Sequence, residues 1–167
     1  MRVADTTGNP ADTGRVPRQT ESITGVTVEL GRRYRFAASH RLHTDKLGEE
    51  ENARVFGKCN NPYGHGHNYV LEIILSGQID PATGMIVNLA DLDGFVEREI
   101  LEAVDHRSLN DDVAVFREKV PTTENLCIEI FERLKSFPNA KLERVRLQET
   151  SNNSFEYSGD DAKGNQS

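Results

Sequence analysis

The first half of the chain alternates apolar and polar positions over two long stretches. Apolar side chains alternate with other residues at Val26, Val28 and Leu30 and again at Tyr34 and Phe36, which predicts one long or bulged strand through residues 26–40. A second alternating run covers residues 65–75, and it places His65 and His67 on the same face as the apolar positions that follow them. The charged residues 45–54 between the two runs predict a loop. The second strand is therefore expected to place two histidines on the core-facing side of the sheet.

The second half of the chain changes to the period of amphipathic helices. Apolar positions at helical spacing over residues 92–104 predict a helix that ends at residues 105–106, with Asp91 as its candidate N-cap. Residues 121–124 predict the start of a second helix, whose apolar stripe runs through residues 126–134. Two helices are thus expected in succession.

Alternation returns after the helices. Residues 144–149 predict a third major strand, and residues 155–157 predict a short fourth strand after a polar turn. The element order is then ββααββ, with connections of hairpin length at each end of the helix pair. This order predicts an α+β fold, in which an antiparallel sheet carries both helices on one face.

Length and charge restrict the class of protein. The 167 residues fit one domain, which we assign to residues 23–157, because residues 1–22 and 158–167 are polar and are expected to be disordered tails. The formal charge of −7 argues against nucleic acid as a partner. The sequence contains no apolar run long enough to span a membrane and no secretory signal, so a cytoplasmic protein is expected.

Histidines at the strand ends are candidate metal ligands. His65 and His67 lie about 7 Å apart along one face of a strand, and His40 at the end of the other long strand can supply a third imidazole. Three neutral histidines with one open position are typical of a catalytic zinc site. The alternative is that these rings only pack or form hydrogen bonds. His43 is out of phase with His40 and is not expected to be a ligand.

Other polar residues are candidates for acid–base chemistry. Cys59, next to Lys58, lies in a polar loop that could lower the pKa of a thiol, so it is a candidate base or nucleophile. The alternatives are a fourth zinc ligand or a thiol without a role in the site. Asp105 and His106 pair a carboxylate with an imidazole, as a proton relay requires. Glu149 continues the inward face of the third strand, and a buried carboxylate needs a partner such as the paired N–H donors of a ligand.

Taken together, these segments resemble one known family. FAASHRL, ENARVFGKCNNPYGHGHNY, GMIVNLADL, AVDHRSLN, VPTTENL and QETSNN, in this order and spacing, resemble the 6-pyruvoyltetrahydropterin synthase family. The resemblance extends over residues 26–157. It implies the tunnelling fold (T-fold), in which subunits join their sheets into barrels and form a homo-hexamer from two trimers.

The resemblance also implies roles for individual residues. The implied sets are the zinc ligands His40, His65 and His67, the proton-transfer residues Cys59, Asp105 and His106, and the substrate-binding residues Glu149, Thr122, Thr123 and Glu124. Residues 122–124 match a segment that lines the pterin pocket from a neighbouring subunit. A site shared between subunits would bring the Asp105-His106 pair to Cys59.

The implied activity is that of a zinc-dependent lyase. It converts 7,8-dihydroneopterin triphosphate into 6-pyruvoyltetrahydropterin with elimination of triphosphate, in biosynthesis of the tetrahydrobiopterin type. The alternative is 6-carboxytetrahydropterin synthase of queuosine biosynthesis, whose members usually have fewer residues between the cysteine and the His-x-His motif than residues 60–64 here. A catalytically silent pterin- or metal-binding module and a structural zinc protein are further alternatives, and the structural zinc protein predicts four protein ligands.

Overall fold

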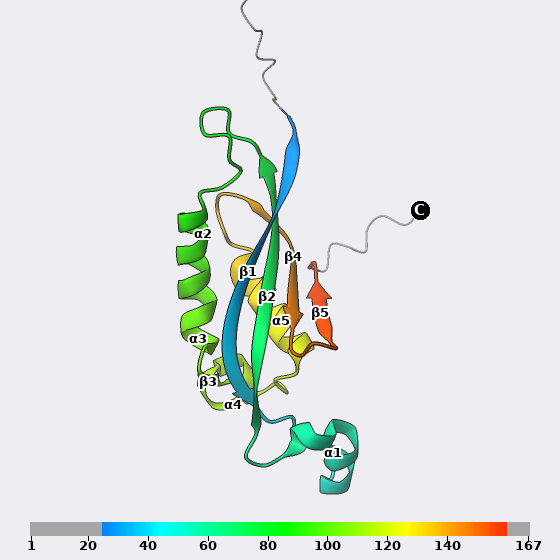
Figure 1. Cartoon of the computed structure of the whole chain (residues 1–167). Helices are drawn as coiled ribbons and strands as arrows, with labels where there is room; N and C mark the ends of the chain where they lie inside the picture. The colour runs from blue at the N-terminus through cyan, green and yellow to red at the C-terminus, as the bar shows by residue number, and fades with distance from the viewer. Residues whose placement is uncertain (1–24, 160–167) are drawn as a thin grey trace, which may run out of the picture.

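The computed structural model describes residues 25–159, which form a five-stranded sheet with several helices beside it (Figure 1). The polar tails expected at 1–22 and 158–167 lie outside these residues, apart from positions 158 and 159. In chain order the elements are β1 (Thr27–His40), α1 (Glu49–Phe56), the 3₁₀ turn η1 (Gly57–Asn60), β2 (His65–Gln78), α2 (Leu89–Val96), the π-helical turn η2 (Glu97–Leu101), α3 (Glu102–Val104), β3 (Arg107–Ser108), α4 (Leu109–Asp112), the 3₁₀ turn η3 (Ala114–Arg117), α5 (Thr123–Leu134), β4 (Lys141–Gln148) and β5 (Ser154–Tyr157).

The register of the two longest strands brings the histidines together. The strands lie in the order β3-β1-β2-β4-β5, and every neighbouring pair is antiparallel except β1 and β3. β1 and β2 pair along their whole length, and at one end His40 lies directly opposite His65. His67 is two residues further along β2. Because side chains alternate between the faces of a sheet, all three imidazoles project from the same face.

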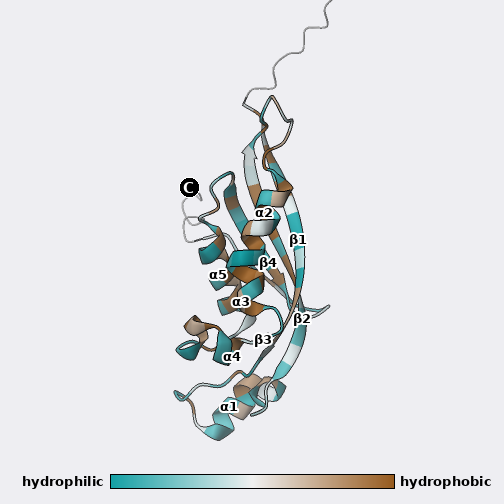
Figure 2. Cartoon of the chain, turned by 90° about the vertical axis from the view of Figure 1, so that its left-hand side faces the viewer, coloured by the Kyte–Doolittle hydropathy of each residue, from teal (hydrophilic) through white to brown (hydrophobic). Residues whose placement is uncertain are grey.

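The helices cover that same face of the sheet. α2, η2 and α3 form one continuous helical run, and together with α5 they lie on one side of the strands (Figure 2). α5 buries Leu126, Ile130 and Leu134 on its apolar stripe, and β2 buries Leu71 and Ile73 in the same core. No described helix covers the opposite face. The α+β architecture predicted from the ββααββ order is therefore present, with a short parallel strand added at one edge.

The longest described segment of regular α-helix is α5, with 12 residues. None of the described helices is both long and apolar enough to cross a bilayer.

One predicted loop is wrong, because part of residues 45–54 belongs to helix α1. This helix buries only Asn52, and it lies beyond the end of the sheet, so it needs no apolar stripe (Figure 1). Asn52 is completely buried; its side-chain oxygen accepts from the Thr44 amide, and its side-chain nitrogen donates to the carbonyls of Thr44 and Leu47, each at 2.9 Å. Helix formation here depends on these polar contacts and on the acidic first turn rather than on hydrophobic periodicity.

The start of the next helix also differs from the prediction. The N-cap of α2 is Asn88, whose side-chain oxygen accepts from the Ala90 amide at 2.9 Å, whereas the prediction was Asp91. The helical run ends at Val104, as expected, and His106 then takes a positive φ of 57°. This conformation turns the chain into β3, which the sequence pattern did not predict.

Candidate metal centre and active site

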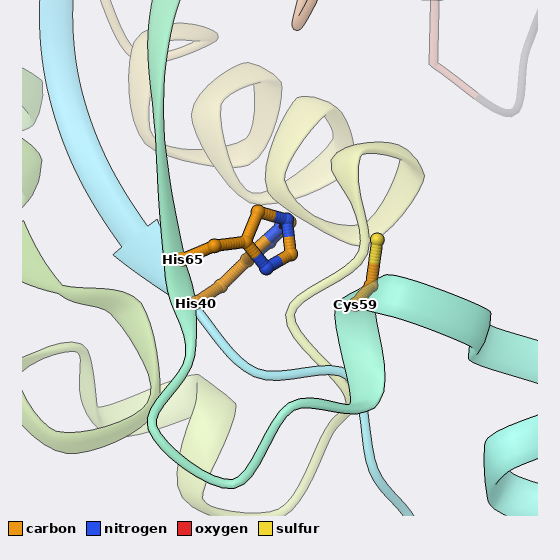
Figure 3. A group of neighbouring side chains, drawn as sticks. All are labelled: His40, Cys59 and His65. Atoms are coloured by element: carbon orange, nitrogen blue, oxygen red, sulfur yellow. Dashed lines mark hydrogen bonds between the residues drawn. The ribbon is translucent and has the colours of Figure 1, made fainter.

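The three candidate histidines form a compact cluster at one end of β1 and β2. The ring centroids are 4.7 Å apart for His40 and His65, 5.1 Å for His40 and His67, and 4.7 Å for His65 and His67, each pair in edge contact. Cys59 approaches the cluster from the neighbouring turn η1 (Figure 3). The structure thus brings together residues that are up to 27 positions apart in the sequence.

The hydrogen bonds of His40 determine which of its nitrogens is free. Its Nδ1 lies 2.8 Å from the carbonyl oxygen of Pro121, and because a carbonyl can only accept, Nδ1 must donate. The lone pair is then on Nε2, which lies 3.2 Å from Nε2 of His65. Burial lowers the pKa of His40, although the Pro121 hydrogen bond opposes this, and burial and the nearby His67 lower the pKa of His65. Both rings are therefore held in the neutral form that binds metals.

The cluster contains buried nitrogens that fit a cation. Nδ1 of His65 and Nε2 of His67 are buried and have no hydrogen-bond partner among the described residues. One potential ligand atom each from His40, Cys59 and His65 lie within 4.8 Å of one another, and the same holds for His40, His67 and Glu149. An unpaired buried polar atom is costly unless something satisfies it. A divalent cation coordinated by the imidazoles fits these residues.

Glu149 closes the other side of the cluster. It follows the last residue of β4, on the inward face that the alternation of residues 144–149 predicted. Its Oε1 accepts a hydrogen bond from the Thr123 hydroxyl at 2.5 Å and lies 3.7 Å from Nε2 of His67, while its Oε2 accepts from the Asn153 side chain at 2.8 Å. Burial by itself would raise the pKa of Glu149, but the hydrogen bonds from Thr123 and Asn153, together with the nearby His67 and His40, hold the pKa below its ordinary value. The carboxylate is an ionised acceptor facing the site.

The environment of Cys59 differs from the prediction. A thiol pKa lowered beside Lys58 was expected, but burial raises the pKa of Cys59, and the charge of Glu149 raises it further. Lys58 is exposed on the turn. The correction follows from the tertiary structure, because desolvation and a carboxylate distant in sequence outweigh the adjacent cation.

The Asp105-His106 pair forms at the edge of the sheet. Oδ1 of Asp105 accepts from the Ala37 amide at 2.8 Å and lies 3.0 Å from Nδ1 of His106, whose side chain is 81% exposed. The backbone bond from Ala37 is the main reason that the pKa of Asp105 is low. His106 and His67 both line a hollow of about 370 Å³. The pair is an ionised carboxylate with an accessible imidazole, separate from Cys59 within the described chain.

The three residues at the start of α5 have different surroundings. Thr122 is the N-cap and its hydroxyl accepts from the Asn125 amide at 3.3 Å. Thr123 is 3% exposed and binds Glu149, whereas Glu124 is exposed in the first turn. Only Thr123 therefore touches the site within this chain.

Sequence reasoning missed two contributors to the site. The Pro121 carbonyl, which orients His40, is a backbone group and leaves no signal in the sequence. Asn153 lies in the polar turn before β5, and its position four residues after Glu149 could have indicated a contact across that turn.

Comparisons with known proteins give matches over most of the described chain. A family model described as 6-pyruvoyl tetrahydropterin synthase matches residues 29–160. A relative from Homo sapiens, named 6-pyruvoyl tetrahydrobiopterin synthase, is 47% identical over 134 residues, which cover 80% of this chain and 92% of the relative. A relative from Haemophilus influenzae, named 6-carboxy-5,6,7,8-tetrahydropterin synthase, is 31% identical over 121 residues, which cover 60% of this chain and 84% of the relative. The structure of Caenorhabditis elegans 6-pyruvoyl tetrahydropterin synthase matches with a TM-score of 0.76 at 45% identity, covering 80% of this chain and 96% of that one.

Proposed function

The chain belongs to the 6-pyruvoyl tetrahydropterin synthase family, and from this premise we propose that it converts 7,8-dihydroneopterin triphosphate into 6-pyruvoyltetrahydropterin. The reaction eliminates triphosphate, so the protein is a carbon–oxygen lyase acting on a phosphate ester. The fold is the T-fold of this family. The higher identity and coverage of the pyruvoyl relatives favour this product over the carboxy product. The observation that carries the proposal is the inward carboxylate of Glu149 facing the histidine cluster.

The metal is proposed to be zinc, held by His40, His65 and His67. Support comes from the neutral rings, from the unpaired buried nitrogens and from the Pro121 carbonyl that orients His40. When bound, zinc would supply Lewis acidity that polarises the side-chain oxygens of the substrate.

Glu149 is proposed to anchor the pterin ring. An ionised carboxylate can accept two parallel N–H donors, such as those on the amidine-like edge of a pterin, in charge-assisted hydrogen bonds. Thr123 and Asn153 hold the carboxylate in place by bonding one oxygen each. Among the described residues, Thr122 and Glu124 have no hydrogen bond to a residue of the site, so we propose that residues 122–124 also line the pocket across a subunit interface.

Cys59, Asp105 and His106 are proposed to move the protons of the reaction. Because the environment of Cys59 favours the neutral thiol, its proton must pass to another group before it can act as a base. The exposed imidazole of His106, beside the ionised Asp105, has the geometry of such an acceptor. The two sets can meet if the pair comes from a neighbouring subunit.

We also propose a cytoplasmic homo-hexamer built from two trimers. β3 pairs with β1 only at Ala38 and Ser39, so among the described strands most of this edge of β1 has no partner. At the other edge of the sheet, β5 pairs with β4 alone. Two open edges support joining of sheets between copies of the chain, because unpaired strand edges favour strand addition.

Product analysis tests the proposed function. The purified protein with one equivalent of zinc is incubated with 7,8-dihydroneopterin triphosphate, and the pterin products are identified by mass spectrometry. A pyruvoyl product with free triphosphate is expected, and removal of the metal by a chelator should abolish turnover until zinc is restored. A carboxy product with acetaldehyde would support the alternative activity. Unchanged substrate would contradict both.

A replacement of Cys59 by Ala separates catalysis from binding. We expect the variant to bind the substrate with little change and to lose turnover, because the thiol is the proposed proton carrier. A variant that turns over normally would contradict the role of Cys59, and unfolding on metal removal would support a structural zinc protein instead.

A further inference from the structure

His43 contacts the turn η1, which carries Cys59, and it is not part of the histidine cluster. Its Nδ1 is 3.0 Å from the side-chain nitrogen of Asn60 and 3.2 Å from the terminal guanidinium nitrogen Nη2 of Arg41. The same Asn60 nitrogen donates to the carbonyl of Leu42 at 2.8 Å, and the Leu42 amide donates to the carbonyl of Cys59 at 2.8 Å. His43 is therefore the shared acceptor in a network that ends on the backbone of Cys59.

The chemistry of the two donors determines the tautomer of His43. Neither the amide nitrogen of Asn60 nor the guanidinium of Arg41 can accept a hydrogen bond, so Nδ1 must carry the lone pair and the proton must be on Nε2. Nε2 in turn faces the carboxylate of Asp45 at 3.8 Å. A residue without an acceptor at the Nδ1 position would leave both donors without this partner.

The network is anchored to the rest of the fold on its other side. The side chain of Asn110, at the start of α4, accepts from the Arg41 amide at 2.8 Å and donates to the Arg41 carbonyl at 3.0 Å. The guanidinium of Arg41 also donates to the Asn60 carbonyl at 3.4 Å. The segment that follows β1 thus connects α4 to the turn η1.

We propose that His43 is a positioning residue for Cys59. Its Nδ1 lone pair fixes the Asn60 and Arg41 side chains, and these hold η1 so that the Cys59 sulfur stays within 4.8 Å of the potential ligand nitrogens of His40 and His65. The inference rests on the proposed function, in which Cys59 carries a proton. Misplacing a reacting group by about 1 Å can cost about 100-fold in rate, so loss of this acceptor should reduce kcat.

Two substitutions of His43 isolate the acceptor. His43→Leu removes it with a side chain of similar volume, whereas in His43→Asn the side-chain oxygen can take the place of Nδ1 and accept the same donors. Asp45→Asn, at a fully exposed position on the Nε2 side, is the matched control.

Steady-state kinetics with 7,8-dihydroneopterin triphosphate are measured for the zinc-loaded proteins, together with thermal melts and the rate of Cys59 alkylation by iodoacetamide. Cys127, which is 1% exposed, serves as the internal reference thiol.

The expected pattern is a split between the variants. In His43→Leu, kcat should fall about 10- to 100-fold while KM changes less than about 3-fold, and alkylation of Cys59 should accelerate. In His43→Asn and Asp45→Asn, kcat should stay within about 3-fold of the wild-type value. An unchanged kcat in a folded His43→Leu protein, or an equal loss in His43→Asn, would overturn the proposal. If the wild type does not turn over this substrate, the proposed function fails separately. Equal alkylation rates in the wild type and His43→Leu would still overturn the role of His43.

Discussion

Replacing Thr123 by Val removes a single hydroxyl from the candidate site while it keeps the size and branching of the side chain. Thr123 is buried, and its hydroxyl donates to Oε1 of Glu149 at 2.5 Å. After the change, one oxygen of a carboxylate that is only 15% exposed loses its donor. The folded state should therefore be destabilised relative to the unfolded state, in which water solvates Glu149.

The structure limits the size of this effect. A hydrogen bond to a charged group contributes about 1.5–3 kcal/mol. Glu149 retains the donor Asn153 at 2.8 Å and has some access to water, so we expect a cost around or just below the lower end of that range, about 1–2 kcal/mol. In a protein of this length, 1 kcal/mol shifts Tm by roughly 2–4 °C, so Tm should fall by roughly 2–8 °C.

Thermal melts of metal-free protein at equal concentration measure this difference, because bound zinc or a change in assembly would alter Tm by mass action. Thr123→Ser is the matched control, since it keeps the hydroxyl and loses only a methyl group. We expect the Ser variant to lie closer to the wild type than the Val variant. A Val variant as stable as the wild type, or a Ser variant equally destabilised, would refute the reasoning.

Two further predictions concern other parts of the chain. The Ser76 hydroxyl, at 2.5 Å, is the main reason that the pKa of Glu143 lies below its ordinary value of 4.5, so Glu143→Gln should cost about 0.5–1 kcal/mol near pH 7. Because a depressed carboxyl pKa stabilises the fold above the unfolded pKa of 4.5, denaturant titrations should show this cost vanish as the pH falls below 4.5 and through the lowered pKa of Glu143. A cost that is constant with pH would be contrary to the assignment. Gly64 has a φ of 67°, and a Cβ added there would lie 2.9 Å from the carbonyl oxygen of His40. Gly64→Ala should therefore destabilise the protein by about 1–3 kcal/mol, and because the clash involves the backbone of His40 it should also reduce the affinity for zinc. Gly84→Ala, with a φ of 73° and open space around it, is the control, and equal losses in zinc affinity for the two variants would rule out the contact with His40 as the cause.

Much of the site follows from the alternation of residues along strands. Period two along β2 puts His65 and His67 on one face, and the same argument predicts that Glu149 points inward after β4. These expectations hold because a strand exposes alternate side chains to the core regardless of its neighbours. The motif resemblance to the synthase family is confirmed by the family match over residues 29–160. The roles of the individual site residues stay predictions.

Other features have no local cause and could not be predicted in this way. Helix α1 has no apolar stripe, because it packs through the polar side chain of Asn52 rather than against the core. The pKa of Cys59 depends on burial and on Glu149, which is 90 positions away in the sequence. Neighbouring charges such as Lys58 therefore mislead when the distant contacts are unknown.

The sequence by itself determined the family, the alternating strands and the residue types available for metal binding and proton transfer, since these are properties of local pattern and motif. Only the tertiary structure decided how the groups act on one another: that Pro121 fixes the tautomer of His40, that Thr123 and Asn153 donate hydrogen bonds to Glu149, and that His43 contacts Asn60 in the turn of Cys59. Protonation and hydrogen bonding depend on distance and burial in space, and these quantities exist only once separate segments pack together.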